Sequence, residues 1–465
     1  MPTPSDTQEI ISNLKSVLLE VNGHPYPEVA CPDGVPKRAS VALILRVQPR
    51  YSHWPTSSEN ASPTFFPDSP TKRRRSSVTS SHKLNFEDKL NAFFEQDWVK
   101  HGDPELLFIK RAARIGDKWN GHVALPGGKR DPEDADDAVT AMREAHEEVG
   151  IDLSDGNAIE VGNLPQRIVT TSWGKVPLMV LCPYIYILTS PSYPAQCLQP
   201  TEVASSHWVP LRALLLPALR TQEYADVSAR LAKSELGIKR WFLQAMLSKM
   251  MFAAIHLVPS NSTHCSTIPD FILADEPSTG LMARVKDTLK GMEGGPRDKK
   301  PPLLLWGLTL GVVSDFLEHI PPHNALELWT YPTFTSWDVR FVMWAMSYRF
   351  RQQKSKEMST SSMASSSDPG TPPIQDLRGL GSEGIGSLYN EKPGEVGIAG
   401  LGVGRGWGRT GRSKMIARGA AVNSMLEGYY PIVRKAVATA LVARIGVAAL
   451  LGFAAWKTFK QNRWH

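Results

Sequence analysis

The sequence has few cysteines and no signal for secretion. Its four cysteines, Cys31, Cys182, Cys197 and Cys265, are widely spaced and form no CxxC pair. This spacing fits a reducing compartment and gives no zinc site of the cysteine-pair kind. The first residues, MPTPSDTQEIISNL, lack the basic-then-apolar order of a secretory signal peptide.

An excess of one charge is also missing. The formal net charge is +6 over 465 residues, and 42% of the residues are apolar. So small an excess of charge does not argue for a nucleic-acid partner, and we expect none. The apolar fraction is ordinary for a protein with a packed core, and the length allows one large domain with appendages or two domains.

A long apolar run occurs near the C-terminus. Residues 436–456, AVATALVARIGVAALLGFAAW, are apolar except for Thr439 and Arg444. About 20 such residues span a bilayer, although an arginine within the span costs about 2.5–3.5 kcal/mol. We expect a single-pass membrane anchor over 434–458 in the membrane of an unspecified organelle, with the rest of the chain facing the cytosol. The alternatives are a surface amphipathic helix and a helix buried in the protein.

The stretch LPGGKRDPEDADDAVTAMREAHEEVGID, residues 125–152, predicts a helix that ends at Gly150. An apolar stripe at helical spacing is formed by Ala138, Val139, Met142, Ala145 and Val149. The acids at its start have a structural explanation, because free N–H groups and the helix dipole favour negative charge there.

Three later glutamates of this helix lack such an explanation. Glu144, Glu147 and Glu148 fall within about 100° of arc, where like charges repel. Hard divalent cations such as Mg²⁺ and Mn²⁺ bind carboxylates and are commonly shared with phosphates. The spacing therefore predicts a metal-dependent site for a phosphate-containing ligand, with an exposed acidic helix face as the alternative.

The same stretch resembles the Nudix box, the signature of the Nudix hydrolases. The usual form is a glycine, five residues, a glutamate, seven residues and REUxEExGU, with U aliphatic. The matching positions are Gly128, Arg143, Glu144, Glu147, Glu148, Gly150 and Ile151. The segment between glycine and arginine is one residue longer than usual, and Ala145 is smaller than the usual aliphatic residue. The glutamate in the middle is absent, so that Glu133 or Asp134 must replace it.

The longer spacing between the glycine and the arginine is similar to that of the coenzyme A diphosphatase-like branch of the family. The preceding segment, KRAARIGDKWNGHVALPGG, is similar to that branch, but Leu125 replaces a phenylalanine and Asp117 an arginine. The resemblance implies hydrolysis of a diphosphate linkage in a nucleoside diphosphate derivative, foremost coenzyme A or acyl-coenzyme A. Hydrolysis of ADP-sugars or dinucleotides is one alternative, and a non-catalytic, membrane-tethered Nudix binding module is another.

The resemblance also implies an α/β/α sandwich. We expect one Nudix domain over 38–350, interrupted by a low-complexity insertion at 48–84 and a second insertion at 216–300. An N-terminal helical segment at 1–37 precedes it. A disordered linker at 354–430, rich in Ser, Gly and Pro, leads to the C-terminal hydrophobic helix.

The roles of individual residues follow from the match. Mg²⁺ or Mn²⁺ would be bound by Glu144, Glu147, Glu148 and the Gly128 carbonyl. The catalytic residues would be Glu144, Glu147 and Arg143, with Arg143 orienting a glutamate. Substrate-binding candidates are Lys110, Arg111, Arg114, Gly127 and Glu202; the alternatives are a solvated strand edge for the basic residues and a surface loop for Glu202. The sequence predicts no particular protein partner.

Overall fold

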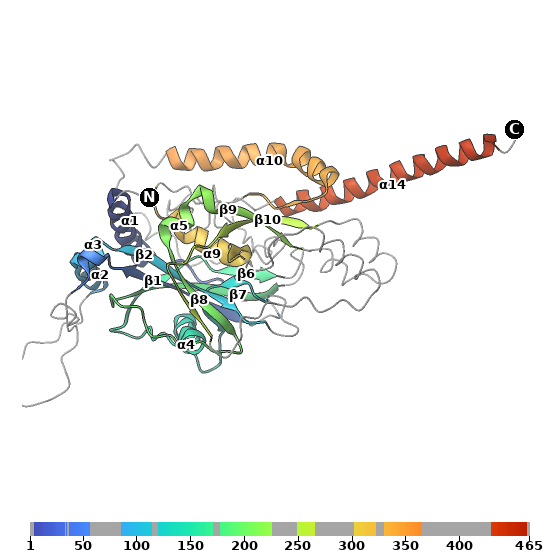
Figure 1. Cartoon of the computed structure of the whole chain (residues 1–465). Helices are drawn as coiled ribbons and strands as arrows, with labels where there is room; N and C mark the ends of the chain where they lie inside the picture. The colour runs from blue at the N-terminus through green and yellow to red at the C-terminus, as the bar shows by residue number, and fades with distance from the viewer. Residues whose placement is uncertain are drawn as a thin grey trace, which may run out of the picture.

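The computed structural model describes residues 4–32, 34, 37–55, 85–113, 120–170, 177–225, 249–265, 302–321, 330–363 and 429–462 (Figure 1). Most of the expected insertion at 48–84 and of the expected linker at 354–430 lies outside these residues.

The centre of the molecule is a mixed β-sheet. Its strand order is β11-β8-β2-β1-β7-β5. The strands are β1 (Arg38–Gln48), β2 (Asp103–Arg111), β5 (Ala158–Asn163), β7 (Pro177–Leu188), β8 (Val203–Pro210) and β11 (Asn261–His264). Strand β1 pairs in parallel with β7 and antiparallel with β2. Three short strands extend it, namely β3 (Val123–Ala124) on β2, β4 (Gly127–Lys129) on β1, and β6 (Arg167–Thr170) on β7.

Both faces of this sheet are buried. Along β1, Ala42 and Ile44 point into one core, and Leu43 and Leu45 point into another. This is the period-2 alternation of a strand, and it explains why the strand is apolar on both sides. The expected α/β/α sandwich is confirmed.

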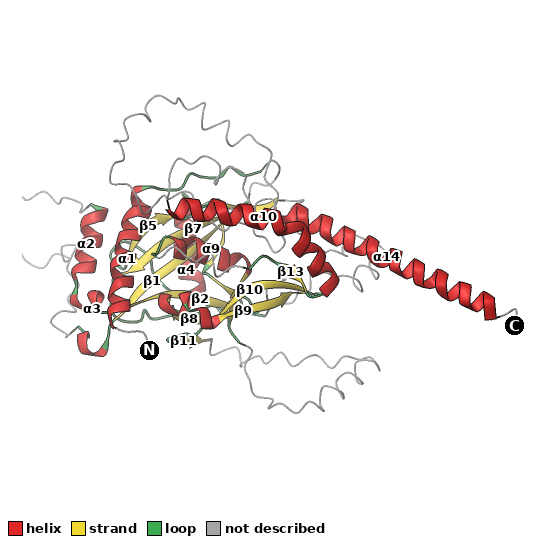
Figure 2. Ribbon diagram, turned by 90° about the horizontal axis from the view of Figure 1, so that it is seen from above, coloured by secondary structure: helices red, strands yellow, loops and turns green. Residues whose placement is uncertain are grey.

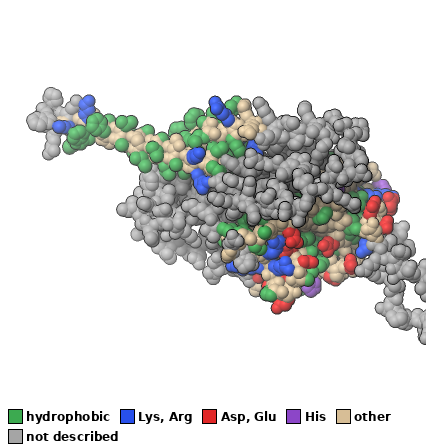
Figure 3. Space-filling view, turned by 180° about the vertical axis from the view of Figure 1, so that it is seen from behind, with side chains coloured by type: hydrophobic (Ala, Val, Ile, Leu, Met, Phe, Trp, Pro, Cys, Tyr) green, Lys and Arg blue, Asp and Glu red, His purple; other side chains and the backbone are tan. Residues whose placement is uncertain are grey.

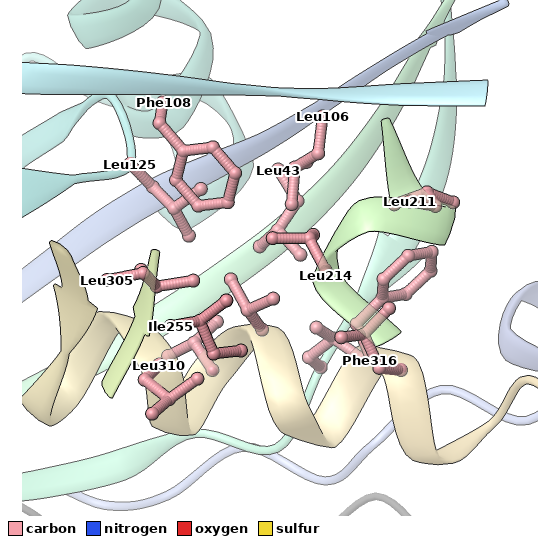
Figure 4. Packing of buried hydrophobic residues seen from close by; sticks show 14 of the residues in the cluster. Leu43, Leu106, Phe108, Leu125, Leu211, Leu214, Ile255, Leu305, Leu310 and Phe316 are labelled. Carbon is pink, nitrogen blue, oxygen red and sulfur yellow. The ribbon is translucent and has the colours of Figure 1, made fainter. Parts of the chain in front are cut away.

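One face carries α4 (Asp137–Val149), and the other carries more elements (Figures 1 and 2). The helices of the second face include α1 (Pro4–Gly23), α2 (Phe86–Glu95), α3 (Asp97–Lys100), α5 (Leu211–Leu215) and α9 (Gly307–Glu318). Figure 4 shows Leu310 and Phe316 of α9 on the same side of the sheet as Leu43, Leu106 and Phe108. Single 3₁₀ turns occur at Tyr51–His53 and Pro217–Leu219.

A second, smaller sheet packs into this same core. It has the order β12-β10-β13, with β9 paired to β10. Its strands are β9 (Arg220–Ala225), β10 (Met250–His256), β12 (Leu304–Trp306) and β13 (Thr333–Phe334). The described parts of the range 216–300 therefore supply β9 and β10 here and β11 at the edge of the main sheet.

Two long helices complete the fold. They are α10 (Trp337–Met363) and α14 (Tyr429–Asn462), and α14 projects away from the domain in Figure 1. Of the residues that the structure describes, 431–460 form the one helix with the length and composition to cross a membrane.

Candidate active site

Helix α4 begins and ends as its sequence predicts. The side chain of Asp136 accepts a hydrogen bond from Val139 N at 2.8 Å, which caps the first turn. Gly150 ends the helix with φ of 74°, a left-handed conformation that favours glycine. Ala141, Ala145 and Val149 are buried against the sheet, and Glu144 and Glu148 lie beside strand β4.

The double glycine is required by two close approaches. Strand β4 pairs with β1 so that Gly127 lies opposite Val41 and Gly128 opposite Ser40. A Cβ on Gly127 would lie 2.3 Å from Ser40 O, and one on Gly128 would lie 2.4 Å from the Glu144 carboxylate. The loop can therefore meet the sheet on one side and a glutamate on the other only without side chains.

Glu148 is the most buried of the three glutamates. Its side chain accepts a hydrogen bond from Gly127 N at 2.8 Å, and only 1% of the residue is exposed. Burial, together with the nearby charges of Glu144 and Glu202, raises the pKa of Glu148 to about 8. Burial also raises the pKa of Glu144, whose side chain is 13% exposed. Both carboxylates therefore lie where a positive charge would stabilise their ionised forms.

Arg143 holds several acidic groups in place. It donates to both carboxylate oxygens of Asp134 at 3.0 Å and to Glu147 at 2.8 Å. It also lies 3.1 Å from Glu144 and donates to the Lys129 carbonyl at 3.0 Å. Arg143 therefore connects strand β4 with two of the α4 glutamates.

Asp134, and not Glu133, contacts this arginine. Asp134 is buried and also accepts hydrogen bonds from Asp131 N and the Thr140 hydroxyl, whereas Glu133 is exposed. The hydrogen bonds from Arg143 lower the pKa of Asp134 to about 2. Of the two residues that could replace the missing glutamate, Asp134 occupies the position beside the arginine.

The Nudix box makes one contact that the sequence does not predict, between Asp137 and Arg38. Arg38 of β1 donates to Asp137 with Nε at 2.8 Å and with a terminal nitrogen at 2.5 Å, and Arg130 lies 3.3 Å from the same carboxylate. The sequence explained Asp137 only as an acid at a helix start. Its burial is the property that separates it from Asp136, and the sequence offers no local signal for that.

The structure places the substrate-binding candidates on different faces of the sheet. Arg111 continues the side of β2 that faces α4, and its charge lowers the pKa of Glu148. Glu202 also faces this site, since its charge raises the pKa values of Glu144 and Glu148. Lys110 points to the opposite face of the sheet, where its charge contributes to lowering the pKa of the buried His207. Arg114 lies outside the described residues.

These groups form a mixed patch on the α4 side of the domain. Figure 3 shows acidic and basic side chains close together on the lower part of the domain, the side on which Figure 1 places α4. Ala112 N donates to Glu202 O at 2.8 Å, and Gln199 N donates to Glu148 O at 3.0 Å. The ends of β2, α4 and the segment before β8 therefore meet at one place.

The sequence of this chain is similar to those of known proteins. The chain matches the family model of the NUDIX domain over residues 98–231. It is 32% identical over 295 residues to the uncharacterized protein C14C4.10c of Schizosaccharomyces pombe, a match covering 62% of this chain and 79% of that protein.

Two shorter matches involve proteins named for an activity. The mitochondrial coenzyme A diphosphatase NUDT8 of Mus musculus is 44% identical over 52 residues, 11% of this chain and 25% of that protein. The peroxisomal coenzyme A diphosphatase NUDT7 of Mus musculus is 47% identical over 53 residues, 11% of this chain and 22% of that protein. The chain thus matches a quarter or less of the length of these two relatives. With its box, its sandwich fold and the family match, the chain belongs to the Nudix hydrolases, enzymes that hydrolyse diphosphate linkages.

Proposed function

We propose that this protein is a metal-dependent hydrolase that cleaves the diphosphate linkage of a nucleoside diphosphate derivative, foremost coenzyme A or an acyl-coenzyme A. The observation that carries the proposal is the convergence of Glu144 and Glu148 on the Gly127–Gly128 turn, with Arg143 connecting the turn to the helix. The local matches to coenzyme A diphosphatases favour this substrate class. Because Asp117 stands where that branch has an arginine, ADP-sugars and dinucleotides are the second candidate substrates.

The residues of the site fit a hard divalent cation. Glu144, Glu147, Glu148 and the Gly128 carbonyl offer the oxygen ligands that Mg²⁺ and Mn²⁺ prefer. Glu144 and Glu148 both have raised pKa values, so a cation beside them would offset the cost of their ionisation. Glu147 is bound to Arg143, and its side chain is half exposed.

The surrounding residues suggest how the reaction proceeds. When bound, the metal neutralises phosphate charge and lowers the pKa of the attacking water. Glu144 is partly accessible and has a raised pKa, and it is the group we assign to accept the proton of that water. Arg111, beside Glu148, supplies a guanidinium for a substrate phosphate. Arg143 fixes the glutamates, and Glu202 adds a further carboxylate toward the same place.

Turnover assays on the purified full chain test this proposal. We expect hydrolysis with Mg²⁺ or Mn²⁺, fastest with coenzyme A or acyl-coenzyme A, and slower with ADP-ribose or diadenosine polyphosphates. Glu148→Gln should abolish most of the activity. If ADP-ribose or a dinucleotide turns over fastest, the substrate assignment is wrong. If no substrate turns over, or if Glu148→Gln matches the natural protein, the catalytic reading is wrong and the binding-module alternative is favoured.

We also propose that α14 anchors the enzyme in a membrane, with the Nudix domain on the cytosolic side. The support is its length and composition and the exposure of its distal half, where Val442, Leu450 and Phe453 are at least 61% exposed. A helix from a soluble core would be mostly buried. Carbonate extraction of cell membranes should retain the full chain and release a chain that ends at Arg444. Release of both would contradict the anchor.

A further inference from the structure

Helix α14 has two parts that differ in their surroundings. From Tyr429 to Ala440 one side of the helix is buried in the domain, through Tyr429, Val433, Ala436, Val437 and Ala440. The Tyr429 hydroxyl also donates to the Pro332 carbonyl at 2.9 Å. Beyond Leu441 nearly every described side chain is exposed. Only this distal part is free to enter a bilayer, so the start of the expected anchor at 434 lies within the docked part.

An ion pair marks the boundary between these parts. Arg444 donates to the Asp338 carboxylate of α10, with its terminal nitrogen 2.6 Å from one oxygen. The contacts of Asp338 with Arg444 and of Phe350 with Tyr429 show that α10 runs antiparallel to the docked part of α14. Arg444 therefore has a partner on the domain and need not be placed in the middle of the bilayer.

The first turns of α10 carry an exposed aromatic stripe beside this boundary. The stripe consists of Trp337, Phe341, Trp344 and Tyr348, which fall within about 60° of arc on the helix. Their exposed fractions run from 48% to 76%, and neighbouring rings of the last three lie 6.2 and 6.1 Å apart between centroids. Val339, Met343 and Ser347 hold the opposite side of α10 against the protein.

We infer that the aromatic stripe of α10 lies in the headgroup region of the same membrane that α14 enters. This inference rests on the proposed anchor and adds a second contact to it. Tryptophan and tyrosine concentrate at membrane–water interfaces because their rings are apolar and carry a polar group. Contiguous exposed apolar patches mark contacts with proteins or membranes, whereas single exposed apolar residues are ordinary.

A lipid bilayer fits this surface better than a protein partner does, because the stripe is continuous with the start of the distal part of α14. Asp338, next to Trp337, binds Arg444, so both helices reach the membrane surface at one level. The exposed Arg340 lies one turn along α10 and suits phosphate headgroups. The membrane thus contacts the domain at two elements, which limits how the domain can rotate about its anchor.

Photo-cross-linking of the full chain in phosphatidylcholine vesicles tests the inference. Benzoylphenylalanine is placed at one position in each variant, Phe341 or Trp344 in the stripe. Met346 is the matched control, because it is an exposed apolar residue of the same helix that lies outside the stripe. Phe453 in distal α14 reports on the anchor itself. We expect lipid adducts at 453, and severalfold more adduct at 341 and 344 than at 346.

The outcomes separate the two proposals. Adducts at 453, with no excess at 341 and 344 over 346, would overturn the inference and leave the anchor standing. Absence of adducts at all four positions would overturn the anchor and the inference together. A protein adduct at 341 or 344 in place of a lipid adduct would assign the stripe to a second copy of the chain and also overturn the inference.

Discussion

The two faces of the central sheet differ in what covers them. The α4 face carries one helix and the residues of the Nudix box, with carboxylates and arginines near the ends of β2 and β4. The opposite face carries α1, α9, the second sheet and the hairpin of α10 with α14, built largely from apolar contacts. The comparison teaches that the proposed active site lies on one face, and that the apolar contacts holding the second sheet and the two long helices lie on the other.

The largest effect should come from the α4 face. Glu144→Gln removes a carboxylate charge from the proposed metal site and should lower kcat/KM by at least about a hundredfold. Glu133→Gln is the matched control, since Glu133 is an exposed acid of the same motif. Steady-state kinetics and circular dichroism of both variants check this. Equal activity of the two variants would remove Glu144 from the site.

The opposite face should respond in stability and not in chemistry. Arg167 of β6 and Asp315 of α9 form a fully buried ion pair. Asp315→Asn leaves the guanidinium without its counter-charge and should lower the free energy of unfolding by about 3–5 kcal/mol. The double variant with Arg167→Met and Asp315→Leu should lose less. Urea unfolding measures this, and turnover per folded molecule should stay unchanged; a large fall in turnover would contradict the separation of the faces.

Strand β4, which lies against Glu144, should be sensitive to a single added methyl group. Gly128→Ala places a Cβ 2.4 Å from the Glu144 carboxylate, so the glutamate must move. We expect a fall in kcat of about tenfold or more with a stability loss of about 1–3 kcal/mol. Gly23→Ala is the control, because nothing lies within 4 Å of its Cβ. Normal kcat in Gly128→Ala would show that Glu144 can move without consequence.

The smallest effect should appear in acid. The pKa of Asp134 is lowered to about 2 in the folded protein and is about 3.9 in an unfolded chain. Its stabilisation of about 2 kcal/mol is therefore present above pH 4 and is lost as pH falls from about 4 to about 2. The difference in unfolding free energy between the natural protein and Asp134→Asn should shrink over that window. A difference that is constant with pH would contradict the ion pair with Arg143.

Much of the site could be predicted because its signals are local. The cap at Asp136, the stop at Gly150 and the apolar side of α4 all lie within one helix. The choice of Asp134 over Glu133 could not be predicted, because it depends on how the loop folds back on Arg143. Strand alternation could have separated Lys110 from Arg111. The pairing of Arg38 with Asp137 depends on two elements that only the fold brings together.

The ion pair at Arg444 has a consequence for where the protein can reside. If the membrane surface lies at that arginine, the part of α14 left to cross, residues 445–460, is about 24 Å long. A typical hydrocarbon core is about 30 Å thick, and a helix shorter than the core must thin the bilayer or extend its terminal cations toward water. Such hydrophobic mismatch sorts proteins among membranes of different thickness. In the proposed anchor, the pairing of Asp338 with Arg444 would thereby favour thin bilayers over thick, sterol-rich ones.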